Sequence, residues 1–149
     1  MTTVTSPQTG RAVGLTAVPD PVFSEAMVGP GTAVDPVREP CEAVAPVGGV
    51  LVSLHPHAFV VVTDGGRGVL THLGIDTVQL NGEGFELLAH KGDTVERGQA
   101  IVRWNPSEVE ASGKSPLCPV VALDADAHAL MDLREEGPVR VGERLFDWS

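Results

Sequence analysis

Short runs of apolar and β-branched residues, each followed by turn-forming residues, succeed one another along most of the chain. Nine runs of this kind predict strands: Ala12–Val18, Thr32–Val37, Ala43–Leu54, Ala58–Thr63, Thr77–Leu80, Phe85–Ala89, Ala100–Trp104, Val120–Leu123 and Val139–Phe146. Turn sequences such as Asp64-Gly65-Gly66 and Asn81-Gly82 lie between them. The pattern predicts an all-β fold, a mostly antiparallel β-sandwich or barrel.

Helical signals are few and short. Pro21–Glu25 follows a possible cap at Asp20, Asn105–Ser112 places Pro106 at a first helical position, and Asp126–Arg134 is a third candidate. We therefore expect a few short helices on the outside of the sheets.

The first ten residues, MTTVTSPQTG, are small and polar and have no hydrophobic periodicity. They predict a disordered N-terminal tail, residues 1–10, in front of a single domain that comprises residues 11–149.

Two glycine-containing stretches resemble each other, Ala45–Val50 and Lys91–Gln99, and a third, Gly137–Glu143, reads much like the second. Repeated strand endings with the same Val and Gly spacing favour an internally duplicated β architecture.

The composition fits a globular protein, with 42% hydrophobic and 20% charged residues, and its 17 Gly and 12 Pro favour turns and strands over helices. A net charge of -10 argues against nucleic acid binding and is compatible with simple solubility or a basic partner protein. No apolar run is long enough to insert into a membrane, so we expect a cytoplasmic protein. Cys41 and Cys118 are expected to be reduced thiols.

Three of the five histidines are candidates for chemistry. In extended backbone, His55 and His57 lie on one face, and a hairpin around Asp64-Gly65-Gly66 would make His57 a neighbour of His72. Asp76 follows His72 by four residues and is a candidate to orient its imidazole. His90 and His128 are expected to be ordinary exposed residues.

The segment His72-Leu73-Gly74-Ile75-Asp76-Thr77-Val78, followed by Leu80–Phe85, strongly resembles the phosphorylation-site signature of glucose-type enzyme IIA domains of the bacterial phosphoenolpyruvate:sugar phosphotransferase system. Further landmarks follow in the same order as in that family: Pro19–Phe23, Met27–Gly29, Ala45–Gly49, His57–Phe59, Lys91–Val95 and Pro119–Val121. The resemblance extends from about Thr16 to Phe146. It implies a duplicated-hybrid-motif-like β-sandwich.

The resemblance also implies roles. His72 would accept a phosphoryl group from the carrier protein HPr, and His57 would assist its transfer to the EIIB domain of an EIIB/EIIC sugar permease of the glucose, N-acetylglucosamine or glucoside class. Regulatory protein targets are a further expectation, and no cofactor is required. Two positions depart from the family pattern: His55 replaces a small hydroxyl residue, and Pro30 replaces an acidic one. The first makes His55 a possible neighbour in the site.

Two alternatives remain open on the sequence alone. A zinc ion bound by His55, His57 and His72 would indicate a hydrolase, and a zinc ion bridging His57 and His72 could also be regulatory. A lipoyl-like or biotinyl-like binding module would share the flanking sequences, but neither Lys91 nor Lys114 occupies the hairpin turn that carries the modified lysine.

Overall fold

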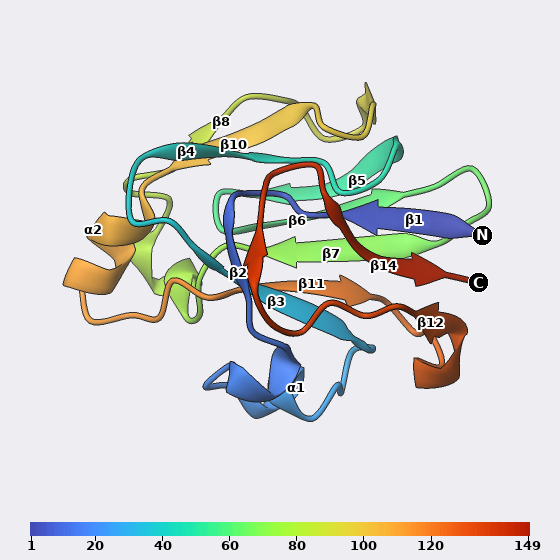
Figure 1. Ribbon diagram of the computed structural model, residues 1–149. Helices are drawn as coiled ribbons and strands as arrows, with labels where there is room; N and C mark the ends of the chain where they lie inside the picture. The colour runs from blue at the N-terminus through green and yellow to red at the C-terminus, as the bar shows by residue number, and fades with distance from the viewer.

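The computed structural model describes residues 1–149 and consists mainly of strands, with two short α-helices and three 3₁₀ turns (Figure 1). The strands are β1 (Thr2–Thr5), β2 (Gly10–Ala12), β3 (Gly31–Pro36), β4 (Cys41–Val44), β5 (Gly49–His55), β6 (Ala58–Val62), β7 (Gly68–His72), β8 (Glu86–Leu87), β9 (Thr94–Val95), β10 (Ala100–Trp104), β11 (Cys118–Ala122), β12 (Leu130–Met131), β13 (Pro138–Val139) and β14 (Arg144–Trp148). The helices are α1 (Pro21–Ser24) and α2 (Pro106–Ala111), and the 3₁₀ turns are η1 (Leu15–Ala17), η2 (Thr77–Leu80) and η3 (Ala127–Ala129).

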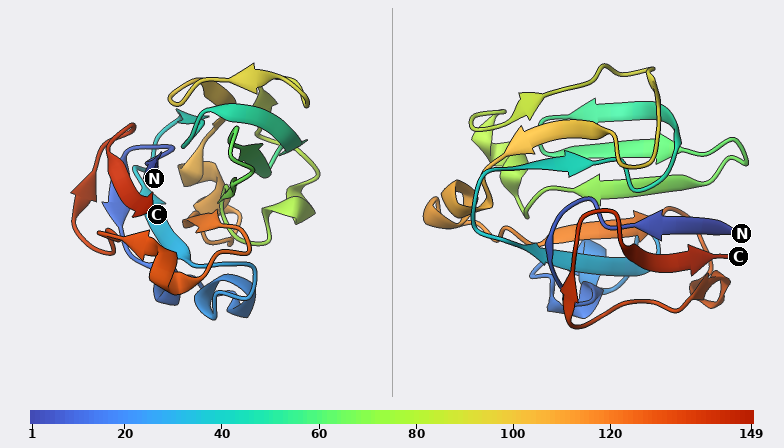
Figure 2. Two further views of the ribbon diagram at one scale, coloured as in Figure 1. Left: turned by 90° about the vertical axis from the view of Figure 1, so that its right-hand side faces the viewer. Right: turned by 45° about the horizontal axis from the view of Figure 1, so that its top comes forward.

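The strands form three sheets in which every pairing is antiparallel. The large sheet has the order β13-β2-β3-β11-β7-β6-β5-β9, and the two small sheets have the orders β1-β14-β12 and β4-β10-β8. Figure 2 shows that the sheets curl around a shared interior. A core of 23 buried residues fills it, with Trp104, Phe59 and Phe146 as its largest fully buried side chains. The predicted all-β antiparallel sandwich with few short helices is confirmed.

A smaller hydrophobic cluster covers the other face of the large sheet. Along β11, Val120 belongs to the main core and Val121 to the second cluster, as expected from the alternation of side chains along a strand. Phe23 of α1 and Leu15 of η1 complete this cluster. Helix α1 and the turn η1 therefore cover part of the outer face of the large sheet, which the two small sheets do not cover.

The predicted internal duplication is visible in the hydrogen bonds of two equivalent turns. The turn after β9 donates from Gly98 N to Ala45 O at 2.9 Å, and the turn after β13 donates from Gly142 N to Ser6 O at 2.9 Å. Both glycines have positive φ, 91° and 86°, which only glycine adopts without strain. Each acceptor is followed directly by a proline.

The two segments that accept these bonds also bond to each other reciprocally. Thr5 N donates to Pro46 O at 3.0 Å, and Val44 N donates to Pro7 O at 2.9 Å. Residues 5–7 of one half and residues 44–46 of the other therefore occupy matching positions around a local pseudo-twofold relation.

The N-terminal segment is ordered, and the predicted disordered tail over residues 1–10 is wrong. Residues Thr2–Thr5 form β1, which pairs antiparallel with β14 from Thr2↔Trp148 to Thr5↔Arg144. The partner lies more than 130 residues away in sequence, so no local pattern could reveal it. Gln8 is 1% exposed, and its Oε1 accepts a hydrogen bond from Trp104 Nε1 at 3.1 Å.

This last contact gives a testable stability effect. The substitution Gln8→Ala leaves the buried indole N–H of Trp104 without an acceptor, and we expect it to lower the free energy of unfolding by about 1–3 kcal/mol. Urea denaturation should show a lower midpoint at unchanged slope. Gln79→Ala is the matched control, because Gln79 is exposed and its side chain bonds only to Lys114 Nζ. Equal midpoints for the two variants would contradict the assignment.

Two of the three predicted helices form as expected. Asp20 caps α1 by accepting from Val22 N at 3.0 Å, and Asn105 caps α2 by accepting from Ser107 N at 3.0 Å. The helix predicted over Asp126–Arg134 is wrong: after the turn η3, the chain enters β12 because it pairs with β14.

Two predicted strands are also replaced by 3₁₀ turns. Gly14 has φ 77° and starts η1 inside the run Ala12–Val18. Thr77–Leu80 forms η2, and the hydroxyl Oγ1 of its first residue, Thr77, donates to Leu73 O at 2.8 Å. In both places a residue with positive φ reverses the chain before a strand can extend, since Asp76 ahead of η2 has φ 59°.

Candidate functional site

The β6–β7 hairpin brings His57 and His72 together. Its turn is closed by Gly66 N, which donates to Thr63 O at 2.9 Å, and the register pairs Ala58 with His72. Leu73 N then donates to His57 O at 2.7 Å. The ring centroids of His57 and His72 lie 5.3 Å apart at an interplanar angle of 65°. The predicted hairpin neighbourhood of these two side chains is confirmed.

His55 joins the same group from the end of β5. Its ring stacks on that of His57, with centroids 5.6 Å apart and an interplanar angle of 30°. His55 is exposed, whereas His57 and His72 are half-buried. The three imidazoles therefore form a row from solvent toward the sheet.

The ring of His72 is held on one side by a backbone carbonyl. Its Nδ1 lies 2.5 Å from Gly74 O, and its face packs against Phe23 at a centroid distance of 5.3 Å. A carbonyl oxygen can only accept, so the contact assigns the hydrogen to Nδ1. In the neutral ring, Nε2 then carries a free lone pair.

This contact corrects the expectation for Asp76. The hydrogen bond that orients the His72 ring comes from the carbonyl of Gly74, and Asp76 forms no hydrogen bond with the ring. Asp76 is exposed and affects His72 only through its charge, together with Asp20. The positive φ of Gly74, 78°, allows its carbonyl to point back at His72.

Burial sets the protonation of both half-buried histidines. Desolvation lowers the pKa of His72 below its usual 6.5, although the Gly74 carbonyl and the charges of Asp20 and Asp76 partly counteract it. Desolvation also lowers the pKa of His57, and the positive charges that His72 and His55 carry when protonated lower it further. Near neutral pH both rings are therefore uncharged.

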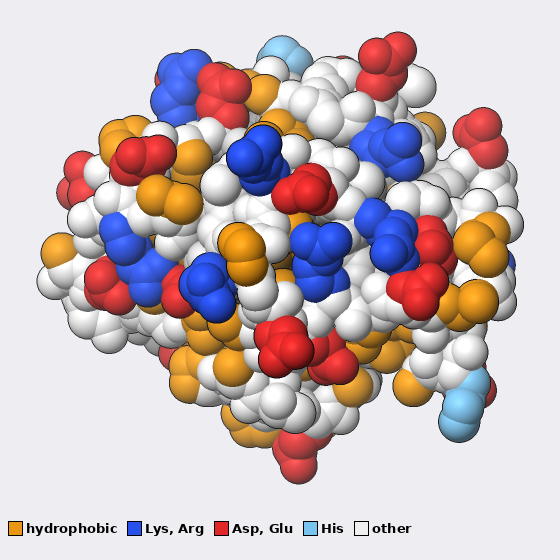
Figure 3. All heavy atoms as spheres, in the orientation of Figure 1, with side chains coloured by type: hydrophobic (Ala, Val, Ile, Leu, Met, Phe, Trp, Pro, Cys, Tyr) orange, Lys and Arg blue, Asp and Glu red, His pale blue; other side chains and the backbone are white.

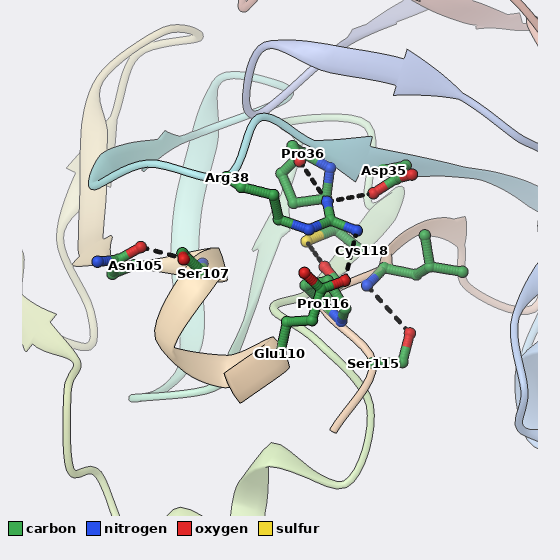
Figure 4. Close-up of polar contacts among 10 residues, drawn as sticks. Asp35, Pro36, Arg38, Asn105, Ser107, Glu110, Ser115, Pro116 and Cys118 are labelled. Carbon is green, nitrogen blue, oxygen red and sulfur yellow. Dashed lines mark hydrogen bonds and ion pairs between the residues drawn. The ribbon is translucent and has the colours of Figure 1, made fainter. Parts of the chain in front are cut away.

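A second layer of contacts supports the Gly74 turn from behind. Ile75 N donates to Ser115 O at 2.8 Å, and the segment that follows is pinned by Cys118 Sγ, which donates to Pro116 O at 3.2 Å. Figure 4 shows Arg38 reaching from the β3–β4 connection to Glu110 on α2, with Nη2 at 3.1 Å from the carboxylate. Helix α2 and the segment after it are thereby fixed beside the site.

Gly74 offers a direct test of this support. A Cβ at Gly74 would lie 2.7 Å from Thr77 Cγ2 and 3.0 Å from Ser115 O, whereas a Cβ at Gly113, which also has positive φ, meets nothing within 4 Å. Gly113→Ala should cost about 1–2 kcal/mol of stability through backbone strain alone. Gly74→Ala should cost about 1–3 kcal/mol more, because of the overlap, as measured by urea denaturation. Equal losses would contradict the close packing of the turn.

Apolar residues of the β6–β7 hairpin belong to two different clusters. Phe59 is completely buried in the main core, on the inner face of β6, and belongs to the packing of the sandwich. Leu70 packs with the second cluster, which includes Phe23. The sequence alone does not predict the contact of Phe23 with His72, and the only local signal near it is the helix start at Asp20-Pro21.

The structure offers no ligand set for a resident metal. No group of three or more His, Cys, Asp or Glu side chains is arranged to hold a metal ion. A zinc hydrolase built on His55, His57 and His72 is therefore not supported.

None of the helices has the length and apolar character needed to span a bilayer.

The fold is a β-sandwich with paired histidines at one hairpin, and comparison with known proteins gives its family. The sequence model of the phosphoenolpyruvate-dependent sugar phosphotransferase system, EIIA 1, matches residues 2–128, and the chain belongs to this family. The lipoyl-like and biotinyl-like alternative is accordingly not supported. The chain is a phosphoryl carrier component of a sugar phosphotransferase system.

Two relatives show how far the similarity reaches. The PTS system glucose-specific EIIA component of Staphylococcus aureus (strain COL) is 37% identical over 140 residues, which are 93% of this chain and 83% of the relative. The structure of the glucose permease IIA from Mycoplasma capricolum superimposes with a TM-score of 0.89 at 32% identity, covering 97% of this chain and 93% of the other.

Proposed function

We propose that this carrier holds the phosphoryl group on Nε2 of His72, accepts it from phosphorylated HPr and passes it to the EIIB domain of a sugar permease. The observation that carries the proposal is the contact between His72 Nδ1 and Gly74 O, which leaves Nε2 as the free nucleophilic nitrogen. The neighbouring ring of His57, 5.3 Å away, supports the same assignment.

The transfer balances without a cofactor. The lone pair of His72 Nε2 forms a bond to phosphorus as the nitrogen–phosphorus bond of the HPr phosphohistidine breaks, and that electron pair returns to the HPr ring. His72 keeps its Nδ1 hydrogen, so the phosphorylated ring is formally positive. Gly74 O stabilises this charge through the hydrogen bond. Onward transfer reverses the step and releases a neutral imidazole.

His57 assists by donating a hydrogen bond. A neutral imidazole has one N–H, and a ring edge at this distance from His72 is within reach of a phosphoryl oxygen on Nε2. A loose transition state needs mainly alignment and donors to the equatorial oxygens. The lowered pKa of His57 keeps its ring uncharged near neutral pH, so solvent-exposed groups take up protons before it does.

Apolar side chains next to the site support docking of partner proteins. Val22 and Met27, in and just after α1, are 39% and 68% exposed, and Val78 in η2 is 57% exposed. These residues flank the two segments that contact His72, so a partner that covers them would exclude water from the phosphoryl group. On the face in Figure 3, by contrast, charged side chains of both signs are interspersed and no group of histidines gathers.

The proposal is tested by reconstitution. Purified enzyme I, HPr and radiolabelled phosphoenolpyruvate are incubated with the chain, and the label is followed on gels before and after acid treatment. Acid-labile, base-stable label on this chain is expected. Subsequent addition of EIIB domains of glucose, N-acetylglucosamine and glucoside permeases would identify the acceptor, and the glucose-specific relatives make a glucose permease the first choice. Absence of label with active HPr would contradict the proposal.

The lowered pKa of His72 predicts a pH dependence with a defined sign. Protonation occupies the Nε2 lone pair, so His72 reacts only above its pKa, and burial places that pKa below 6.5. As pH falls, the reactive form should therefore persist through 6.5 and decline only below it. A titration of the His72 ring nitrogens by NMR measures the midpoint directly, and a midpoint above 6.5 would contradict the effect of burial.

A further inference from the structure

His55 is a third imidazole, and the proposed phosphoryl transfer through His72, assisted by His57, gives it no role. It stacks on His57 at 5.6 Å, and His57 meets His72 edge-on at 5.3 Å. His55 is the exposed end of this row, and His72 is its half-buried end. A side chain in this position can change both the orientation of the His57 ring and the charge beside it.

Neighbouring rings in the row disfavour simultaneous protonation. His57 is penalised by burial and by positive charge on either neighbour, whereas the exposed ring of His55 is solvated by water. Positive charge is therefore disfavoured on His57, inside the row, relative to its solvent-exposed end. Stacking also restricts rotation of the His57 ring, which must keep its N–H directed at the phosphoryl group.

The surrounding charged groups are few. His55 ends β5 and His57 lies in the β5–β6 connection. The neighbouring strand β7 contributes His72, whose pKa is raised by the charges of Asp20 and Asp76. The loop after η2 approaches Pro56, since a Cβ at Gly82 would lie 3.3 Å from the proline ring, and Glu83 is the next residue of that loop. Apart from the histidines, these groups are acidic, and the neighbouring segment adds the cation of Lys114, whose Nζ donates to Gln79 Oε1 in η2 at 2.9 Å. Protonation of His55 would add a positive charge within the row itself.

We propose that His55 is a positioning residue that holds the His57 ring by stacking and carries a proton that balances the phosphoryl group on His72. The inference rests on the proposed function, because the phosphoryl group supplies the negative charge that the proton balances. Coupling between proton and phosphoryl group is reciprocal: protonation of His55 stabilises phosphorylated His72, and phosphorylation favours protonation of His55. The contribution of His55 to the stability of the phosphorylated state is therefore expected to increase as pH falls from 8.5 to 6.

The test measures the equilibrium of phosphoryl exchange between HPr and the chain at pH 6 and pH 8.5. At each pH, the equilibrium constant of the native protein is divided by that of His55→Gln, which cancels the pH dependence of HPr. We expect a ratio of about 3 at pH 6, typical of an exposed charge interaction, and about 1 at pH 8.5. His90→Gln, which removes another exposed histidine, is the control and should give about 1 at both. A ratio for His55→Gln that is equal at both pH values overturns the proposal.

A second variant separates charge from packing. In His55→Lys the ammonium stays charged at both pH values, so the phosphorylated state should be favoured at pH 8.5 as well as at pH 6. A lysine variant that behaves like the glutamine variant overturns the charge role. NMR adds a readout that a structural role would not move: the midpoint of the His55 titration should rise on phosphorylation. Label that persists in His72→Gln would show instead that the proposed function has failed, and the inference with it.

Discussion

His72→Gln is expected to reduce phosphoryl acceptance from HPr by at least about a thousandfold, because the amide of glutamine has no nucleophilic lone pair in place of Nε2. The ring it removes is held by Gly74 O and packs against Phe23, so the substitution acts at the centre of the site. The measurement is the rate of label transfer from phosphorylated HPr under single-turnover conditions. The protein should remain folded, as checked by its urea midpoint.

His128→Gln is the matched control for this loss. His128 is exposed, and its ring contacts only the side chain of Asp126 in the turn η3, far along the chain from the β6–β7 hairpin. We expect acceptance within about twofold of the native rate. If His72→Gln accepts label as fast as His128→Gln, the acceptor is another residue and the proposed function is wrong.

His57→Gln is expected to separate the two half-reactions. The amide still offers an N–H to the phosphoryl group, so the variant should accept label from HPr. It has more rotatable bonds than an imidazole and lacks the stack with His55, so its donor is poorly aligned when the phosphoryl group leaves. We expect onward transfer to EIIB to fall by about a hundredfold to a thousandfold.

The experiment follows decay of the label on this chain after EIIB is added. His90→Gln, prephosphorylated in the same way, provides the reference rate, because His90 is exposed and lies outside the histidine row. Transfer at the reference rate would remove His57 from the mechanism. A failure to accept any label would instead place His57 in the first half-reaction.

The elements that the sequence predicts correctly are those with local causes. The turn at Gly65-Gly66 defines the β6–β7 hairpin, and its register follows from turn position, so the meeting of His57 with His72 could be derived before the fold was known. The helix starts at Asp20 and Asn105 could also be predicted from the sequence, because a cap and the proline that follows it act within one turn.

The elements that it does not predict depend on distant partners or on backbone direction. The strand β1 forms because β14 supplies its hydrogen bonds, and nothing in a threonine-rich start indicates that partner. The choice between Asp76 and Gly74 as the contact of His72 depends on where a carbonyl points after a positive φ, which residue types do not specify. His55, in turn, could be named a neighbour but its stacking could not be foreseen.

The pairing of β1 with β14 also determines where polypeptide attached to the chain would emerge. Figure 1 shows both ends of the chain at one end of the sandwich, while β7 runs toward the opposite end and finishes at His72. A linker joined at either end would therefore start away from the histidine row and leave its approach unobstructed. A reporter or a covalently tethered partner domain can accordingly be fused to this carrier, with its local concentration set by the length and stiffness of the linker.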